Sequence, residues 1–287
     1  MITCHSETVL SGRKNAVENY QLPLISRTRA ASSKISSASF ILSGKLHPAL
    51  NMAIDEALLR CAQERGAQGL IVRFYDWDRP SVSIGYFLNH SMARAMVAPD
   101  AENPFVVRRP TGGGMVRHGS DVTYSMIFPQ AWLPPEFSGD SGSYRFVHGI
   151  LSKALLGIRE FEDIEALPGA GGQRGKIFNC FAQPSPFDLM LHGKKIAGAA
   201  QRRSKGWILH QGSVQWEHAI GGSVAGRSVI LSRKAEKDLP RRFFACLTQA
   251  QNDIGPNIFR PLTPEESQLA SQLFATRYNT PAWNKKF

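Results

Sequence analysis

The sequence predicts an α+β (α/β) fold in which helices flank a mixed, largely antiparallel sheet. Short runs typical of strands come in clusters between a few helical segments, and they do not alternate with helices as in a regular βαβ fold. No repeat and no strong linker divides residues 38–287, so we expect a single domain there. The composition, 43% hydrophobic and 20% charged, is typical of a soluble globular protein.

The first 37 residues differ from the rest and are predicted to form a flexible N-terminal extension. Residues 26–37 are rich in serine and arginine, lack acidic residues and show no apolar period. A disordered leader, a start codon assigned too early and an organelle transit peptide remain open, although Glu7 and Glu18 count against a transit peptide. The folded part is expected to begin near Phe40.

The first predicted element is an amphipathic helix over residues 49–65. Met52, Ile54, Leu58 and Cys61 recur at helical spacing, and Gly66 supplies a stop. Cys61 falls on the apolar face, so it is predicted to be a core cysteine.

Strands, a second helix and a capped helix follow. Strand-like runs separated by proline, glycine and aspartate are found at residues 70–75, 81–84, 105–108, 122–128 and 207–210. Residues 144–159 are predicted to be helical, and residues 189–192 and 195–199 form a predicted hairpin around Gly193. Near the end, Thr263, Pro264 and Glu266 have the pattern of an N-cap, a first-turn proline and a capping box.

Cysteine spacing and charge limit the classes of function. The four cysteines lie far apart without a Cys-x-x-Cys pair, which argues against a metal site or a disulfide framework and favours the reducing cytoplasm. No apolar run reaches the roughly 18 residues of a membrane-spanning helix. The net charge of +11 suggests either an acidic partner or a generally basic surface. Without a run of five basic residues or a known nucleic-acid module, nucleic acid is the weaker choice.

A glycine-rich stretch, Arg-Arg-Pro-Thr-Gly-Gly-Gly at residues 108–114, is a candidate anion or oxyanion site. Glycines allow a ligand to approach the main chain, whose N–H groups bind negative charge. The alternative is a plain tight loop, but Arg108, Arg109 and His118 nearby favour the functional interpretation. A second glycine-rich stretch, residues 169–177, lacks the spacing of a phosphate-binding P-loop, and we interpret it as a mobile loop.

Cys180 and Lys195 form the other candidate site. A cysteine near an ammonium group is held as a thiolate, which is a strong nucleophile. A lone cysteine such as Cys180 is more often a structural thiol than a nucleophile, and a lone lysine such as Lys195 is nearly always a solvated surface charge. A hairpin turning at His192 and Gly193 returns its second strand toward the loop that contains Cys180, so contact is feasible.

Three segments together resemble the family of lipoate–protein ligase A and octanoyltransferases, the biotin/lipoate protein ligase catalytic domains. Residues 108–118 are similar to the signature loop of this family, residues 193–203 with 208–213 to its lysine motif, and residues 51–58 to its first helix. The resemblance runs from about residue 40 to the end of the chain. It implies an α/β catalytic domain shared with biotin ligases.

The resemblance is nearest to the cysteine-dependent octanoyltransferase branch. It implies that Cys180 is the nucleophile and that Lys195 lowers the pKa of its thiol. Octanoate, or lipoate, would pass from acyl carrier protein to a lysine of a lipoyl domain or of glycine-cleavage H protein, without a cofactor, a metal, nucleic acid or a membrane. The implied substrate-binding residues are Arg109, Gly112, Gly113, Gly114, His118, Asp188 and Gly198.

Other activities remain open from the sequence. Gly114 stands where many transferases of this branch carry arginine, and three glycines are typical of ATP-dependent lipoate–protein ligases, which need ATP and Mg²⁺ and act through lipoyl-AMP. Biotin is a further candidate acyl group. A basic nucleic-acid-binding domain is the non-enzymatic alternative.

Overall fold

The computed structural model describes residues 37–66, 69–97, 103–139, 141–158, 161, 163–167, 184–215, 238–249 and 257–287. Within these residues, one large sheet contains, in spatial order, β11 (Asn257–Phe259), β1 (Ser37–Leu46), β2 (Gly69–Trp77), β6 (Asp121–Pro129), β10 (Trp207–Gln215), β9 (Lys194–Ser204), β8 (Leu189–Leu191) and β7 (Ile164–Ala166). A small sheet contains β4 (Phe105–Arg108), β3 (Ser81–Ile84) and β5 (Met115–His118).

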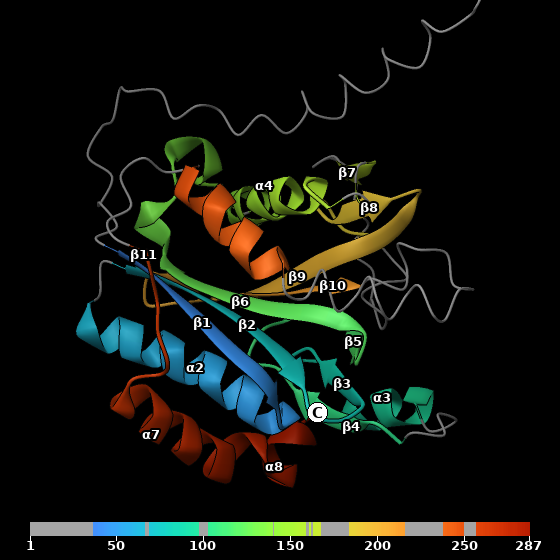
Figure 1. Cartoon of the computed structure of the whole chain (residues 1–287). Helices are drawn as coiled ribbons and strands as arrows, with labels where there is room; N and C mark the ends of the chain where they lie inside the picture. Colours follow the sequence, from blue (N-terminus) through green and yellow to red (C-terminus); the bar gives the residue numbers. More distant parts are fainter. Residues whose placement is uncertain are drawn as a thin grey trace, which may run out of the picture.

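Helices lie on both faces of the large sheet (Figure 1). The helices and helical turns are α2 (Pro48–Arg65), α3 (His90–Val97), η1 (Gln130–Trp132), η2 (Pro135–Phe137), α4 (Gly142–Leu156), α7 (Pro264–Leu273), the π-helical turn η4 (Phe274–Tyr278) and α8 (Pro281–Asn284). Residues 238–249 are also helical. No helix in the described part of the chain is long and apolar enough to cross a membrane.

Strand pairing in the large sheet is mostly antiparallel, as predicted. β1 pairs in parallel with β11 and β2, whereas β2–β6, β6–β10, β10–β9, β9–β8 and β8–β7 are antiparallel. The parallel β1–β2 pair is connected through α2, because parallel neighbours need a crossover rather than a tight turn. The prediction of a mixed sheet flanked by helices is confirmed.

Helix α2 has the bounds that its sequence signals predict. The Nδ1 of His47 accepts from the N–H of Ala49 at 3.2 Å, Pro48 opens the first turn, and Gly66 ends the helix at a φ of 55°. The position after the last turn has a left-handed backbone conformation, and glycine is favoured there because glycine has no Cβ. Cys61 is buried, which confirms its predicted place on the apolar face.

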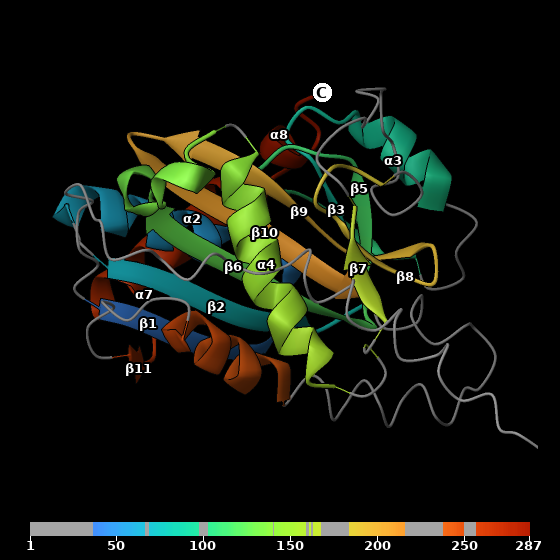
Figure 2. The same cartoon turned by 90° about the horizontal axis from the view of Figure 1, so that it is seen from above.

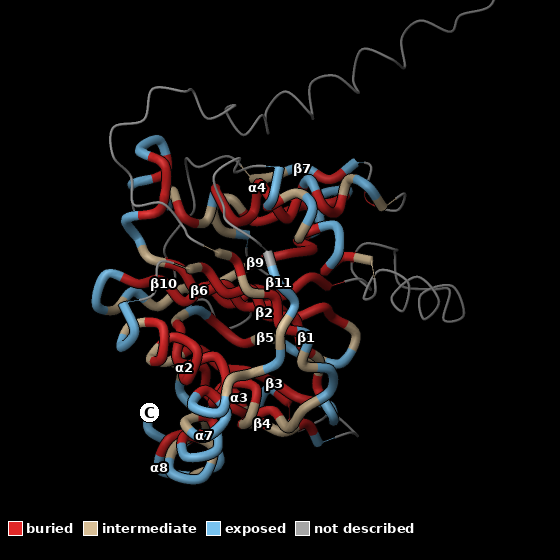
Figure 3. The backbone as a smooth tube through the Cα atoms, turned by 60° about the vertical axis from the view of Figure 1, so that its left-hand side comes forward, coloured by how far each residue is buried: buried red, intermediate tan, exposed pale blue. Residues whose placement is uncertain are grey.

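Two hydrophobic clusters fill the opposite faces of the large sheet. One packs α4 and residues 238–249 against one face, where Leu239, Phe243 and Leu247 recur every fourth residue. The other packs α2 and α7 against the opposite face. Figure 2 shows α4 running across the sheet, and Figure 3 shows that the central strands are almost entirely buried. A sheet covered on both faces gives a rigid base for side chains at its edges.

Neither α3 nor β5 was predicted from the sequence. α3 has only eight residues, of which Ala93 and Val97 are buried, so it is shorter than the window of about 11 residues over which a helical period is recognised. β5 follows directly after the triple glycine, and only its first residue, Met115, is buried. The hairpin of β8 and β9 and the capping box before α7 are confirmed, the latter by the reciprocal bonds between Thr263 and Glu266.

Candidate active site

The loop at residues 109–114 is held in shape by the guanidinium group of Arg109. Its Nη1 donates to the carbonyl and the hydroxyl of Ser83, each at 2.9 Å, and its Nη2 donates to the carbonyls of Gly112 and Gly114 at 2.8 and 3.0 Å. Arg109 is buried and also lines a cavity described below. Its first role is therefore to fix the backbone of the glycine loop.

The glycines of this loop serve different purposes. Gly113 has a φ of 86°, a backbone conformation that residues other than glycine rarely adopt. Its carbonyl lies against Gly85, where an added Cβ would approach the oxygen to 1.8 Å. Among the described residues, the N–H groups of Gly112 and Gly113 donate no hydrogen bond, so both can donate one to an anionic oxygen.

His118 is fixed on both of its ring nitrogens. Its Nδ1 lies 2.8 Å from Oδ2 of Asp121, its Nε2 lies 2.7 Å from Oγ of Ser83, and its ring stacks on Trp77 at 3.9 Å. Burial raises the pKa of Asp121, but the His118 ring and two hydroxyl donors outweigh burial, so the net pKa is lowered. Asp121 therefore remains a carboxylate and orients the imidazole.

Lys195 forms a buried ion pair with Asp188. The Nζ lies 2.7 Å from Oδ2 of Asp188, and the two residues are only 7% and 4% exposed. The same Oδ2 accepts from the N–H of Ser185 at 2.6 Å. Lys195 is thus a buried, oriented cation rather than a solvated surface charge.

The backbone next to Asp188 is strained and supported from α4. Phe187 has a φ of 68°, and its carbonyl accepts from the Nδ1 of His148 at 2.6 Å. Burial lowers the pKa of His148, so the ring is neutral at pH 7. His148 therefore stabilises the turn that presents Asp188 to Lys195.

Gly198 makes room for this ion pair. An added Cβ at residue 198 would lie 2.4 Å from Cε and 2.7 Å from Nζ of Lys195, and 3.1 Å from Oδ1 of Asp188. The glycine in the lysine motif therefore has a local steric reason. Because Gly198 has no side chain, the Lys195 side chain can lie against β9.

We predict that Gly198→Ala displaces the Lys195 ammonium and lowers the rate of the catalysed reaction on the order of 100-fold, because ångström-scale misplacement of a reacting group is that costly. The matched control is Gly139→Ala, which places its Cβ in open space. Steady-state rates and thermal unfolding of both variants check this. Unchanged rates in folded Gly198→Ala would contradict the steric argument.

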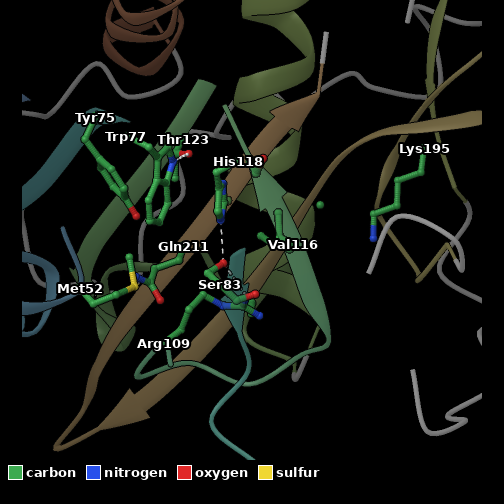
Figure 4. Close-up of a pocket in the computed structure, with 15 residues that line it drawn as sticks. Met52, Tyr75, Trp77, Ser83, Arg109, Val116, His118, Thr123, Lys195 and Gln211 are labelled. Atoms are coloured by element: carbon green, nitrogen blue, oxygen red, sulfur yellow. Dashed lines mark hydrogen bonds between the residues drawn. The ribbon is translucent and has the colours of Figure 1, made fainter. Parts of the chain in front are cut away.

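A cavity joins these groups (Figure 4). It holds about 470 Å³ of empty space, including the part open to solvent. Its lining comprises Met52, Tyr75, Trp77, Ser83, Arg109, Val116, His118, Thr123, Lys195, Gly198, Ala199, Ala200, Gln211, Gly212 and Ser213. In Figure 4, Trp77 and His118 lie side by side, and Lys195 stands apart from the other labelled side chains. Small residues on β9 and β10 and apolar side chains from α2 and β2 suit an aliphatic chain.

A buried polar network connects the cavity to the core. Asp55 of α2 accepts from Arg73 at 2.8 Å, from Tyr75 at 3.0 Å and from Gln211 at 2.7 Å. The Oε1 of Gln211 accepts in turn from Thr111 in the glycine loop at 2.8 Å. Asp55 therefore sets the position of Gln211 and, through it, of the loop.

The structure brings together the predicted residues Arg109, His118, Lys195 and Gly198, all of which line the cavity. Asp188 contacts Lys195, and Gly112–Gly114 form the adjoining loop. Cys180 lies outside the described residues. Ser83, Trp77 and Asp121 were not predicted as site residues, because they come from different strands and share no motif. Gln211 lies in residues 208–213, which belong to the resembled lysine motif, and Asp55 lies in residues 51–58, the resembled first helix, but neither had a predicted role.

Comparison with known proteins identifies the same family. Residues 47–242 match the family model described as the lipoyl protein ligase A/B catalytic domain. Octanoyltransferase LipM of Bacillus subtilis is 38% identical over 281 residues, covering 86% of this chain and 97% of that protein. Octanoyltransferase LipM of Halalkalibacterium halodurans is 38% identical over 186 residues, covering 61% of this chain and 64% of the relative's length.

A solved structure supports the fold. The bipartite lipoate protein ligase of Thermoplasma acidophilum, described together with its E2 lipoyl domain, has a TM-score of 0.57 at 21% identity, over 87% of this chain and 96% of that chain. The family model covers more than half of the sequence, and it includes the glycine loop and the Lys195–Asp188 pair. This chain therefore belongs to the lipoyl protein ligase A/B catalytic-domain family.

Proposed function

We propose that this protein is an octanoyltransferase of protein lipoylation, which moves an octanoyl group from an acyl carrier protein to a specific lysine of a lipoyl domain or of glycine-cleavage H protein. The observation that carries the proposal is the buried Lys195–Asp188 pair at an apolar cavity. The relatives named octanoyltransferase LipM support the acyl group and the reaction.

In the first step, the Cys180 thiolate attacks the carbonyl carbon of the octanoyl thioester. A new C–S bond forms, the carrier thiolate leaves, and it takes up a proton. The Lys195 ammonium favours the thiolate form of Cys180 by its positive charge. Within the described residues the N–H groups of Gly112 and Gly113 donate no hydrogen bond, so they are suited to stabilise the oxyanion of the tetrahedral intermediate.

In the second step, the neutral amine of the target lysine attacks the octanoyl-enzyme. A C–N bond forms, the Cys180–acyl bond breaks, and the protonated nitrogen of the tetrahedral intermediate gives its proton to solvent or to the departing thiolate, which leaves a neutral amide. The amide is more stable than the thioester, so transfer runs toward the acceptor. The reaction as proposed consumes no ATP and needs no metal, and its donor and acceptor belong to the cytoplasm.

The test compares two sets of substrates with intact-mass spectrometry. Apo lipoyl domain is incubated with octanoyl-carrier protein alone, or with octanoate or lipoate plus ATP and Mg²⁺. We expect octanoylation from the carrier without ATP, an octanoyl-enzyme sensitive to hydroxylamine, and loss of both in Cys180→Ser. Activity that requires ATP and survives Cys180→Ser would instead indicate a ligase.

Cys246→Ser is the matched control for this test. Burial raises the pKa of the Cys246 thiol, so it stays protonated and poorly nucleophilic at pH 7. Full activity of Cys246→Ser beside an inactive Cys180→Ser would assign the thioester to Cys180.

A further inference from the structure

Three chain segments that meet around the glycine loop carry no acidic residue. Residues 81–97, 103–120 and 267–287 contain seven Arg and Lys and none of the 23 Asp and Glu of the chain. β3 pairs with both β4 and β5, and the N–H of His90 donates to the carbonyl of Phe287 at 3.0 Å, so the segments are adjacent in space. In Figure 1 the C-terminal end lies beside β4 and α3. These three segments therefore carry a net charge of +7, more than half of the net charge of +11 of the chain.

Aromatic side chains stand exposed within this acid-free region. Phe87 is 77% exposed and Phe287 is 44% exposed, with ring centroids 5.9 Å apart. Tyr86 lies 4.8 Å from Phe87 and 5.8 Å from Phe287. The Nζ of Lys286 donates to the hydroxyl of Tyr86 at 2.7 Å and lies 5.3 Å from the Phe287 ring. We call Tyr86, Phe87, Lys285, Lys286 and Phe287 the Phe87 surface.

The Phe87 surface is attached directly to the glycine loop. The N–H of Tyr86 donates to the carbonyl of Thr111 at 2.8 Å, and the N–H of Gly85 donates to the carbonyl of Gly114 at 3.2 Å. The aromatic rings thus lie on the chain that forms the edge of the candidate active site. A partner bound here would be held next to the reacting groups.

The backbone that carries the Phe87 surface is held in place by a buried arginine. The buried guanidinium of Arg108 donates to the carbonyls of Gly85, Tyr86 and Leu88 on one side, and to those of Trp283 and Asn284 on the other. One arginine therefore fixes the two backbone segments that carry the exposed rings. A preorganised surface loses little conformational entropy when a partner binds.

We propose that the Phe87 surface is the docking site of an acidic acyl-acceptor domain, with Phe87 and Phe287 as apolar anchors and Lys285 and Lys286 pairing with its carboxylates. This inference rests on the proposed octanoyl transfer. A lysine side chain has only a four-carbon stem, so the folded domain that carries the target lysine must touch the edge of the site. Exposed aromatic anchors flanked by two exposed lysines suit such a contact.

The experiment separates docking from chemistry. The variants Phe87→Asp and Lys285→Glu/Lys286→Glu are assayed in two ways: formation of the octanoyl-enzyme from octanoyl-carrier protein, and the KM for apo lipoyl domain in the transfer step. We expect the acceptor KM to rise about tenfold or more, and its salt dependence to weaken in the charge variants, while octanoyl-enzyme formation is unchanged.

Leu42→Asp/Lys45→Glu is the matched control, because both residues are exposed on β1, outside the acid-free segments. An unchanged acceptor KM in the Phe87-surface variants would overturn the proposal. A lower rate of octanoyl-enzyme formation with an unchanged acceptor KM would also overturn it, because the surface would then bind the donor. Absence of any octanoyl transfer by the unmodified protein would instead refute the proposed function.

Discussion

Lys195→Met is expected to lower the rate of octanoyl-enzyme formation about 10³-fold, the scale of removing one preorganised electrostatic group from an active site. Methionine keeps the aliphatic length of the stem but removes the ammonium that lies 2.7 Å from Asp188. Without this cation, less of the Cys180 thiol is ionised at neutral pH. The rate measured against pH should accordingly rise toward higher pH in the variant.

Lys194→Met is the matched control for Lys195→Met. Lys194 precedes Lys195 in β9 but is exposed, so its removal should change the rate less than twofold, as expected of a solvated charge. Circular dichroism and thermal unfolding establish that both variants fold, and Lys195→Arg provides a second, charged variant. A folded Lys195→Met with nearly full activity would contradict the assigned role.

Asp55→Ala is expected to lower the free energy of unfolding by about 3–5 kcal/mol, the cost of leaving a buried charge without its partner. Asp55 and Arg73 are both fully buried, and their ion pair measures 2.8 Å. The substitution also frees Gln211, which holds Thr111 of the glycine loop. Activity should therefore fall even under conditions where the variant stays folded.

Urea unfolding of Asp55→Ala beside Lys45→Ala measures this difference. Lys45 forms a surface ion pair with Asp76 at 3.7 Å, and its side chain is 72% exposed. Removing such a pair should cost less than about 1 kcal/mol. Equal losses in the two variants would show that the Asp55 network contributes no more than a surface contact.

Local signals predicted most of the regular structure. α2 was predicted because apolar residues recur at helical spacing and Gly66 follows them as a stop, and the structure adds that Pro48 opens its first turn. The β8–β9 hairpin was visible because His192 and Gly193 lie between alternating runs, and both adopt positive φ values of 49° and 73°. α3 was not visible, because only two of its side chains reach the core. β10 runs to Gln215, five residues beyond its predicted end, since polar residues there are buried in the network around Asp121.

The candidate site was predicted as a set of motifs rather than as an arrangement. Arg109 and His118 were expected to bind substrate, and that remains a prediction. In the structure they also hold each other in place through Ser83, to which both are hydrogen bonded. Asp188 was likewise expected near the substrate. The structure shows that it contacts Lys195, a relation that a seven-residue separation does not reveal.

The fold class, the glycine loop, the lysine motif and the basic character of the chain can be read from the sequence, because each depends on composition or on residues close in sequence. The structure was needed to show that Lys195 is buried against Asp188, that Asp55 reaches the glycine loop through Gln211, and that three acid-free segments meet around that loop. These relations join residues from separate strands and helices. They depend on strand register, burial and backbone conformations such as that of Phe187, which sequence spacing does not encode.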